Sequence, residues 1–248
     1  MIIDSFLFNG EEQMLNFRLH HYDGVVDKFV IIESTLTILG EPKELTWPKM
    51  KDRFSKFESK IQYVQLNLEG EWPVREAGVL SIDCDDEDIV FHSDVDEIWN
   101  YKNLDTVKDL LVHHEAVRFT GEWYAYDIEH RIVNIDSFLS YAILGKNRFV
   151  NVNSYRGYKL KLPTAAEHKG WHLTWFGGLK QCVKKASSGL GSDFFRIIEY
   201  EDEEDIIDAV VDRFNKKRLP LLAGPQGRSL EYIPISENKN LPRCYDLL

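Results

Sequence analysis

The chain has 248 residues, of which 44% are hydrophobic, enough for one large α/β domain with a full core. Its net charge of −11 argues against broad binding to nucleic acid, which requires a basic face. Three widely spaced cysteines show no zinc spacing or disulfide framework, and no apolar run is long enough for a signal peptide or a membrane span. We therefore expect a soluble protein in a reduced, cytoplasmic setting.

Strand and helix patterns alternate over the first hundred residues. The apolar runs predict strands at 1–8, 25–32, 61–66 and 88–91, separated by helices at 11–22, 48–60 and 72–83. Such alternation is typical of a mostly parallel, Rossmann-like sheet flanked by helices. Ligands of such sheets bind outside the carboxyl ends of the strands.

The second half of the chain is less regular. The patterns predict helices at 104–113 and 201–217 and strands at 116–127 and 170–176, while 141–152 is ambiguous. After Leu219 a tail containing Pro220, Pro225, Pro234 and Pro242 is expected to wrap irregularly. No linker interrupts the chain, so we expect a single domain over 1–248, with halves at about 1–98 and 99–248.

An acidic cluster follows the strand predicted at 88–91. Asp94, Asp96 and Glu97 occupy three of four positions, and in an extended segment the two aspartates point to the same side. Paired carboxylates suit Mg²⁺ or Mn²⁺, which usually take their other ligands from water and substrate phosphates. A solvated acidic turn is the alternative interpretation.

Five segments, taken in order, resemble glycosyltransferase family 17, the bisecting N-acetylglucosaminyltransferase family. They are IDSFLFNGE at 3–11, VDKFVIIES at 26–34, GEPK at 40–43, SDVDEI at 93–98 and GWHLTWFGG at 170–178. The resemblance implies a GT-A type fold, a UDP-sugar donor, a divalent metal and inversion at the anomeric carbon. The halves at 1–98 and 99–248 would then serve the nucleotide-sugar and the acceptor.

The sequence departs from the family pattern at three places. Trp99 stands where the family often has proline, Arg75 lies in an unusual helix start, and the family's His-Glu pair is missing around 187–189. These departures leave the donor sugar and the acceptor open. With no membrane anchor, a bacterial or viral origin is expected, and the acceptor is a glycan or another hydroxyl compound.

The resemblance assigns a metal site to Asp94, Asp96 and His172. Asp96 would be a direct ligand, and Asp94 would reach the ribose or a metal-bound water. An imidazole ligand favours Mn²⁺ over Mg²⁺. On the residues alone, His172 lies among aromatic residues and could equally be a core residue, and Glu97 could cap a helix.

Four further residues are candidates for the nucleotide. Glu33 and Ser34 end a buried strand and could bind the uracil or the ribose, or could cap a turn. Lys43 and Arg75 could balance phosphate charge, or could be surface residues.

The catalytic base is the least defined role. An inverting transfer requires a carboxylate that takes the proton of the acceptor hydroxyl. Asp127 is the first candidate, because it ends an aromatic strand whose rings could stack on a sugar, and Glu122 is the second. Glu129 and Glu167 follow.

Three alternatives compete with this hypothesis. One is a phage-type enzyme that glycosylates hydroxymethylated DNA bases, against which the acidic charge counts. Another is a non-catalytic module that binds nucleotide sugars. The third is a metal-dependent phosphohydrolase, which would more naturally carry an aspartate nucleophile where this chain has Asn9.

Overall fold

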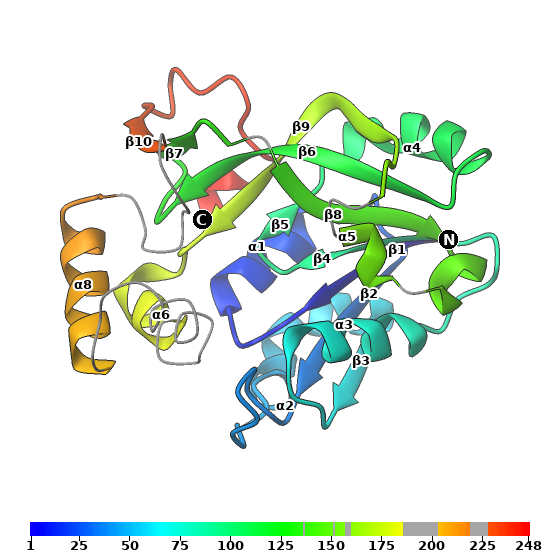
Figure 1. The fold of residues 1–248 in the computed structure, drawn as a ribbon, viewed down its shortest axis with the longest axis horizontal. Helices are drawn as coiled ribbons and strands as arrows, with labels where there is room; N and C mark the ends of the chain where they lie inside the picture. The colour runs from blue at the N-terminus through cyan, green and yellow to red at the C-terminus, as the bar shows by residue number, and fades with distance from the viewer. Residues whose placement is uncertain (136, 151, 157–159, 186–202, 219–227) are drawn as a thin grey trace.

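The computed structural model describes residues 1–135, 137–150, 152–156, 160–185, 203–218 and 228–248. These residues build a ten-stranded mixed sheet with helices against it (Figure 1). The main strand order is β10-β7-β6-β8-β4-β1-β2-β3, and β9 pairs with both β5 and β6. The predicted α/β class is confirmed, and one continuous sheet joins the two predicted halves.

The N-terminal half is a parallel block in the order β3-β2-β1-β4. Its strands are β1 (Ile2–Leu7), β2 (Lys28–Ser34), β3 (Ile61–Leu66) and β4 (Ile89–Asp94). Its helices are α1 (Glu12–His21), α2 (Trp47–Met50) and α3 (Glu71–Leu80), with the 3₁₀ helix η1 at Lys51–Lys60.

Alternating side chains of β2 serve two apolar cores. Phe29 and Ile31 join the core on the α1 side, whereas Val30 and Ile32 join the core on the α3 side. This is the alternation that a strand buried on both faces requires. At Gly78 of α3 an added Cβ would lie 2.6 Å from Ile32, so glycine allows α3 to approach the sheet closely.

The second half extends the sheet with longer strands. β8 (Ser137–Leu144) lies antiparallel to both β4 and β6 (Ala116–Ala125), and β9 (Thr164–Thr174) lies parallel to β6. The carboxyl ends of β6 and β9 therefore point in the same direction as those of β1, β2 and β4. Figure 1 shows β9 running into α6 (Gly178–Lys185) at this edge, where α8 (Glu203–Asn215) also lies.

Short elements complete the fold. They are β5 (Glu97–Ile98), β7 (His130–Val133), β10 (Ser229–Tyr232), α4 (Leu104–Leu111), α5 (Asn153–Arg156), and the 3₁₀ helices η2 (Tyr101–Asn103), η3 (Gly145–Phe149) and η5 (Tyr245–Leu247).

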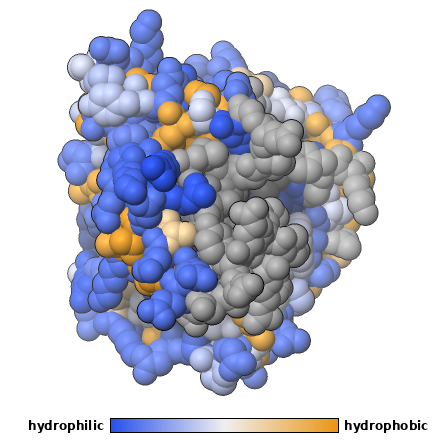
Figure 2. All heavy atoms as spheres, turned by 60° about the vertical axis from the view of Figure 1, so that its left-hand side comes forward, coloured by the Kyte–Doolittle hydropathy of each residue, from blue (hydrophilic) through white to orange (hydrophobic). Residues whose placement is uncertain are grey.

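Figure 2 turns the α6 and α8 side forward; its coloured surface is mainly hydrophilic, with hydrophobic residues in small groups.

Three predicted elements differ in the structure. The helix predicted at 48–60 is a short α-helix followed by a 3₁₀ helix with a kink at Phe54, although Met50, Phe54 and Phe57 are buried as its apolar face predicted. The ambiguous segment 141–152 includes the end of β8 and η3. The tail is not wholly irregular, because β10 pairs with β7; its part at 219–227 and the start of the helix predicted from 201 lie outside the described residues.

Candidate active site

The acidic cluster is held by a buried arginine from α1. Arg18 donates two hydrogen bonds of 2.7 Å to the carboxylate of Asp4 on β1. It also donates to the backbone carbonyls of Asp94 (2.8 Å), Val95 (3.2 Å) and Glu97 (2.9 Å). Because every one of these donors is charged and buried, the turn after β4 is fixed relative to β1 and α1.

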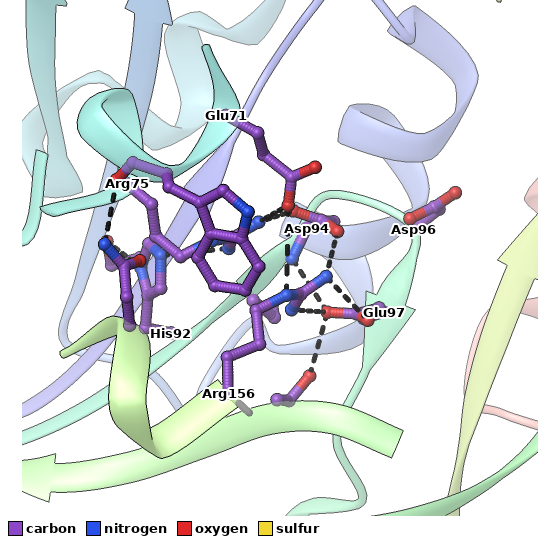
Figure 3. A network of polar contacts seen from close by, with 12 residues as sticks. Glu71, Arg75, His92, Asp94, Asp96, Glu97 and Arg156 are labelled. Atoms are coloured by element: carbon purple, nitrogen blue, oxygen red, sulfur yellow. Dashed lines mark hydrogen bonds and ion pairs between the residues drawn. The ribbon is translucent and has the colours of Figure 1, made fainter. Parts of the chain in front are cut away.

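Asp94 lies between two arginines (Figure 3). Arg75 of α3 donates to one carboxylate oxygen at 2.7 Å, and Arg156 of α5 donates to the other. Arg156 also binds both oxygens of the buried Glu97, at 2.7 and 3.2 Å. Burial alone would raise the pKa of Asp94, but the charges of Arg156 and Arg75 outweigh it and hold that pKa far below its usual range.

Asp96 has different neighbours. The chain turns at residues 95–96, so the two aspartates do not share the single extended face that the sequence predicted. One Asp96 oxygen lies 3.6 Å from Nε2 of His172 on β9, and the other lies 3.2 Å from Nζ of Lys185 on α6. Burial raises the pKa of Asp96, but the charges of Lys185 and His172 outweigh it and lower the pKa. In Figure 3 Asp96 stands apart from the arginine network.

A cavity of about 140 Å³ opens at the carboxyl ends of β1, β2 and β4. This is the edge where parallel α/β sheets bind ligands. Of the candidates named from sequence, Ser34, Lys43, Asp94 and Asp96 line it; Glu11, Glu71 and Lys185 are further charged lining residues that sequence reasoning did not assign.

Charged groups meet around Asn9 at the rim of this cavity. Lys43 donates to Oδ1 of Asn9 at 2.8 Å, and Lys184 donates to its backbone carbonyl at 2.9 Å. Oε2 of Glu11 accepts from the Asn9 amide at 2.7 Å. Burial raises the pKa of Glu11 and lowers the pKa of Lys43. The cavity is thus a desolvated site with both signs of charge, which is a common property of functional sites.

The carboxylate of Glu33 forms its hydrogen bonds within the protein rather than facing the cavity as a ligand contact. Its carboxylate is fully buried and accepts hydrogen bonds from the backbone amides of Thr46 (2.7 Å) and Trp47 (3.2 Å) and from the Tyr63 hydroxyl (3.0 Å). It therefore secures the start of α2, which is the capping alternative. Arg75 is likewise occupied, because its guanidinium binds Asp94 and does not line the cavity.

The two candidate bases lie apart from the cavity lining. Asp127, just past β6, pairs with His130 (2.5 Å) and Lys217 (3.1 Å). Burial raises the pKa of Asp127, but hydrogen bonds from His130 and Lys217 outweigh it and lower the pKa, which keeps the group ionised. Asp127 follows the strand at the same sheet edge as Asp96.

Glu122 points to the other face of β6. Its oxygens contact Tyr124, Arg131 and Asn240, whereas the neighbouring Trp123 ring packs on His172 with 4.0 Å between ring centroids. Because adjacent residues of a strand face opposite ways, Glu122 faces away from the Asp96 side. Glu129 hydrogen bonds the Tyr232 hydroxyl, and Glu167 is exposed on β9.

Asp96 and His172 fit a divalent cation as two protein ligands. No group of three His, Cys, Asp or Glu side chains forms a ready metal cage within the described ranges. Each oxygen of Asp94 is already paired with an arginine. Asp96 lines the cavity and faces His172, which lies outside the lining and whose Nδ1 is buried without a hydrogen-bond partner in the described part of the chain. A carboxylate and an imidazole leave the other coordination positions to water and substrate phosphates.

The fold and the site together define an α/β protein with a charged cavity at the carboxyl edge of its parallel strands. The sequence profile of glycosyltransferase family 17 matches residues 1–215. The chain therefore belongs to glycosyltransferase family 17, which confirms the resemblance seen in the sequence.

One curated relative is the beta-1,4-mannosyl-glycoprotein 4-beta-N-acetylglucosaminyltransferase of Rattus norvegicus, which is 23% identical over 245 residues. The match covers 83% of this chain and 46% of the rat protein, so the chain spans about half the length of that relative.

Solved structures with partial likeness are nucleotidyltransferases. The 4-diphosphocytidyl-2C-methyl-D-erythritol synthase of Anaerococcus prevotii has 14% identity and a TM-score of 0.40, covering 86% of this chain and 95% of that one. The inositol-1-phosphate CTP transferase of T. maritima has 6% identity and a TM-score of 0.39, covering 70% and 89%. Because these TM-scores are below 0.5, we describe the fold from the sheet topology of this chain alone.

Among residues with described positions, none of the helices combines the length and the apolar character needed to cross a membrane.

Proposed function

We propose that this protein is a metal-dependent, inverting glycosyltransferase that moves a sugar from a UDP-sugar to a hydroxyl acceptor. The observation that carries the proposal is the pair formed by Asp96 and His172, which face each other 3.6 Å apart beside the cavity. Family membership supports the transfer of a sugar, and the charged cavity supports a nucleotide-sugar donor.

The cation would be Mn²⁺ or Mg²⁺, held by Asp96 and His172. Bound there, it would act as a Lewis acid and offset the negative charge that grows on the departing diphosphate. Asp94 would have a different role from Asp96. Because Arg75 and Arg156 fix both of its oxygens, Asp94 would orient the turn and present its remaining lone pairs to the ribose or to a coordinated water.

The nucleotide would lie over the ends of β1 and β2. Ser34 and Lys43 line the cavity there, and the Lys43 side chain is only 18% exposed, with its ammonium 3.8 Å from Glu33, so its charge is weakly screened by solvent. Desolvation of that ammonium favours an anionic partner, which supports a phosphate contact. Glu33 would act indirectly, by securing the segment that follows Lys43.

The reaction requires one proton acceptor. The acceptor oxygen attacks the anomeric carbon, the bond from that carbon to the diphosphate breaks with its electron pair, and the hydroxyl proton passes to a carboxylate. We propose Asp127 as that base, since it is ionised and follows β6 at the active edge. Its pairs with His130 and Lys217 would have to open toward the acceptor.

The acceptor is proposed to be a glycan hydroxyl. The rat relative carries a mannosyl-glycoprotein acceptor in its name, which favours this class over modified DNA. A cytoplasmic location and a bacterial or viral source stay predictions from the sequence.

A thermal-shift screen of nucleotide sugars with and without Mn²⁺ tests the proposal. A donor at 100 times its Kd stabilises the native state by about 2.7 kcal/mol, which for a chain of this size raises Tm by roughly 5–11 °C. We expect the rise caused by a UDP-sugar to be clearly larger with Mn²⁺ than without it, and we expect Asp96→Asn to abolish this metal-dependent part. An equal rise without metal, or in the Asp96→Asn variant, would refute the metal-dependent site.

A further inference from the structure

Lys185 reaches the site because the chain reverses sharply after β9. Trp175 adopts a left-handed backbone with φ 61°, and Gly177 and Gly178 follow with φ 96° and 77°. A bulky non-glycine residue rarely adopts such a conformation, and strain of this kind concentrates at functional sites. The reversal returns α6 over the acidic cluster, so that its last residue, Lys185, faces Asp96.

The ammonium of Lys185 occupies a defined position beside Asp96 and the Trp175 ring, which we call its seat. Its Nζ lies 3.2 Å from Asp96 and 5.8 Å from the centroid of the Trp175 ring, and the side chain is only 18% exposed. Glu11 shares the cavity and adds a second negative charge. Burial lowers the pKa of Lys185, but Asp96 and Glu11 outweigh it and raise the pKa, so the group is cationic at neutral pH.

This seat overlaps the proposed metal position. Both Lys185 and His172 face the carboxylate of Asp96, which offers its two oxygens to one partner each. A divalent cation bound between Asp96 and His172 would stand beside the ammonium, and two positive charges so close in a partly desolvated site repel strongly. The lysine and the metal therefore compete for the Asp96 carboxylate unless a ligand brings negative charge beyond that of Asp96 and Glu11.

We propose that Lys185 is a diphosphate ligand that holds the Asp96 site in the donor-free protein and transfers to the diphosphate when the donor binds, which frees Asp96 for the metal. The inference rests on the proposed UDP-sugar site. The diphosphate supplies the negative charge that allows the ammonium and the metal to coexist, so that metal and donor bind cooperatively. Lys185 then stabilises the leaving group, while its seat protects Asp96 from metal when no donor is present.

The test is the Mn²⁺ affinity of the donor-free protein, measured by electron paramagnetic resonance of unbound Mn²⁺. Replacing Lys185 by methionine removes the competing charge, so Lys185→Met is expected to bind Mn²⁺ more tightly, by roughly 5- to 150-fold, the usual range of a coupling between two ligands. The matched control is Lys180→Met, which removes an exposed lysine from the same helix. Its Mn²⁺ affinity should equal that of the wild type.

A second readout concerns the diphosphate and needs no metal. In EDTA the wild type should bind UDP more tightly than uridine, and Lys185→Met should lose much of that difference while its uridine affinity stays unchanged. Lys185→Arg, which keeps the charge, should retain it. A circular dichroism melt verifies that each variant is folded.

The outcomes separate the two proposals. If Lys185→Met binds Mn²⁺ no more tightly than the wild type, while the wild type still binds Mn²⁺ together with UDP, the Lys185 proposal is overturned and the proposed function stands. If the wild type fails to bind Mn²⁺ even with UDP, both are overturned.

Discussion

Replacing Arg156 by methionine should destabilise the folded protein, because Arg156 is a charge partner of both Asp94 and Glu97. Arg156 is 5% exposed and Glu97 is 1% exposed, and the guanidinium binds both Glu97 oxygens as well as Asp94. Methionine fills much of the same volume but leaves the Glu97 carboxylate buried; among the described residues it keeps the Asp94 amide at 3.0 Å and the Ser140 hydroxyl at 3.4 Å as partners.

The magnitude follows from this burial. Removing one partner of a buried ion pair costs about 3–5 kcal/mol. Because Asp94 is 29% exposed, part of its loss is screened by solvent, and we expect the lower end, about 3 kcal/mol. For a chain of this length that is a fall in Tm of roughly 6–12 °C.

The assay is urea denaturation and thermal melting at neutral and acidic pH. Arg156 and Arg75 hold the pKa of Asp94 below its unfolded value, so this carboxylate stabilises the fold above that unfolded value and loses its contribution as pH falls through the folded one. The deficit of Arg156→Met should therefore be fully present from pH 7 down to about pH 4 and should shrink only below the unfolded pKa of Asp94, 3.8, where its stabilising contribution in the wild type is progressively lost.

The matched control is Arg53→Met, which breaks an exposed pair with Glu12 and should change stability by less than about 1 kcal/mol. If Arg156→Met melts within about 2 °C of the wild type, where a 3 kcal/mol loss requires several degrees, the reasoning about the buried network is wrong.

Three other changes test separate parts of the account. Glu33→Gln should lower stability by about 1–2 kcal/mol in urea melts, because two backbone amides lose a charged acceptor, and leave UDP affinity unchanged; a large loss of UDP affinity would instead indicate a nucleotide contact. Asp127→Asn should abolish transfer in a UDP-release assay while UDP-sugar binding survives; near wild-type turnover would remove Asp127 as the base. Burial lowers the pKa of His21 to about 4, so as pH falls the unfolded chain is protonated at His21 before the folded chain is. The free energy of unfolding should therefore fall by up to about 3 kcal/mol between pH 6.5 and pH 4. His21→Asn should reduce this pH dependence, and an unchanged pH dependence would contradict the prediction.

The four strands of the parallel half could be predicted from the sequence. Continuous β-branched residues around Val30 predict a strand buried on both faces, and the acidic residues after Phe91 place the cluster at a strand end. These are local signals, because strand burial and strand ends are written in consecutive residues. The parallel direction of these strands followed from the alternation of strands and helices, whereas their order in the sheet was not predicted.

The charge partners could not be predicted in the same way. Arg156 lies 62 residues from Asp94 and Lys185 lies 89 residues from Asp96, and no spacing rule connects such positions. Arg18 carried a weak signal, as a charged residue within the apolar pattern of a helix next to Phe17 and Leu19.

Two further differences arise from backbone geometry. The sequence treated 94–96 as extended, whereas a turn at 95–96 gives Asp94 and Asp96 different partners. The segment 51–60 keeps the apolar spacing of a helix, but tightens into 3₁₀ turns that a periodicity of buried residues does not distinguish.

The most direct test of the central claim is an anomalous diffraction map of crystals soaked with Mn²⁺ and UDP. We expect one manganese peak with an Asp96 oxygen and His172 Nε2 among its ligands, and with Asp94 still held by its two arginines. In these crystals, UDP bound in the cavity with no manganese peak beside it, or a manganese peak away from Asp96 and His172, would contradict this expectation.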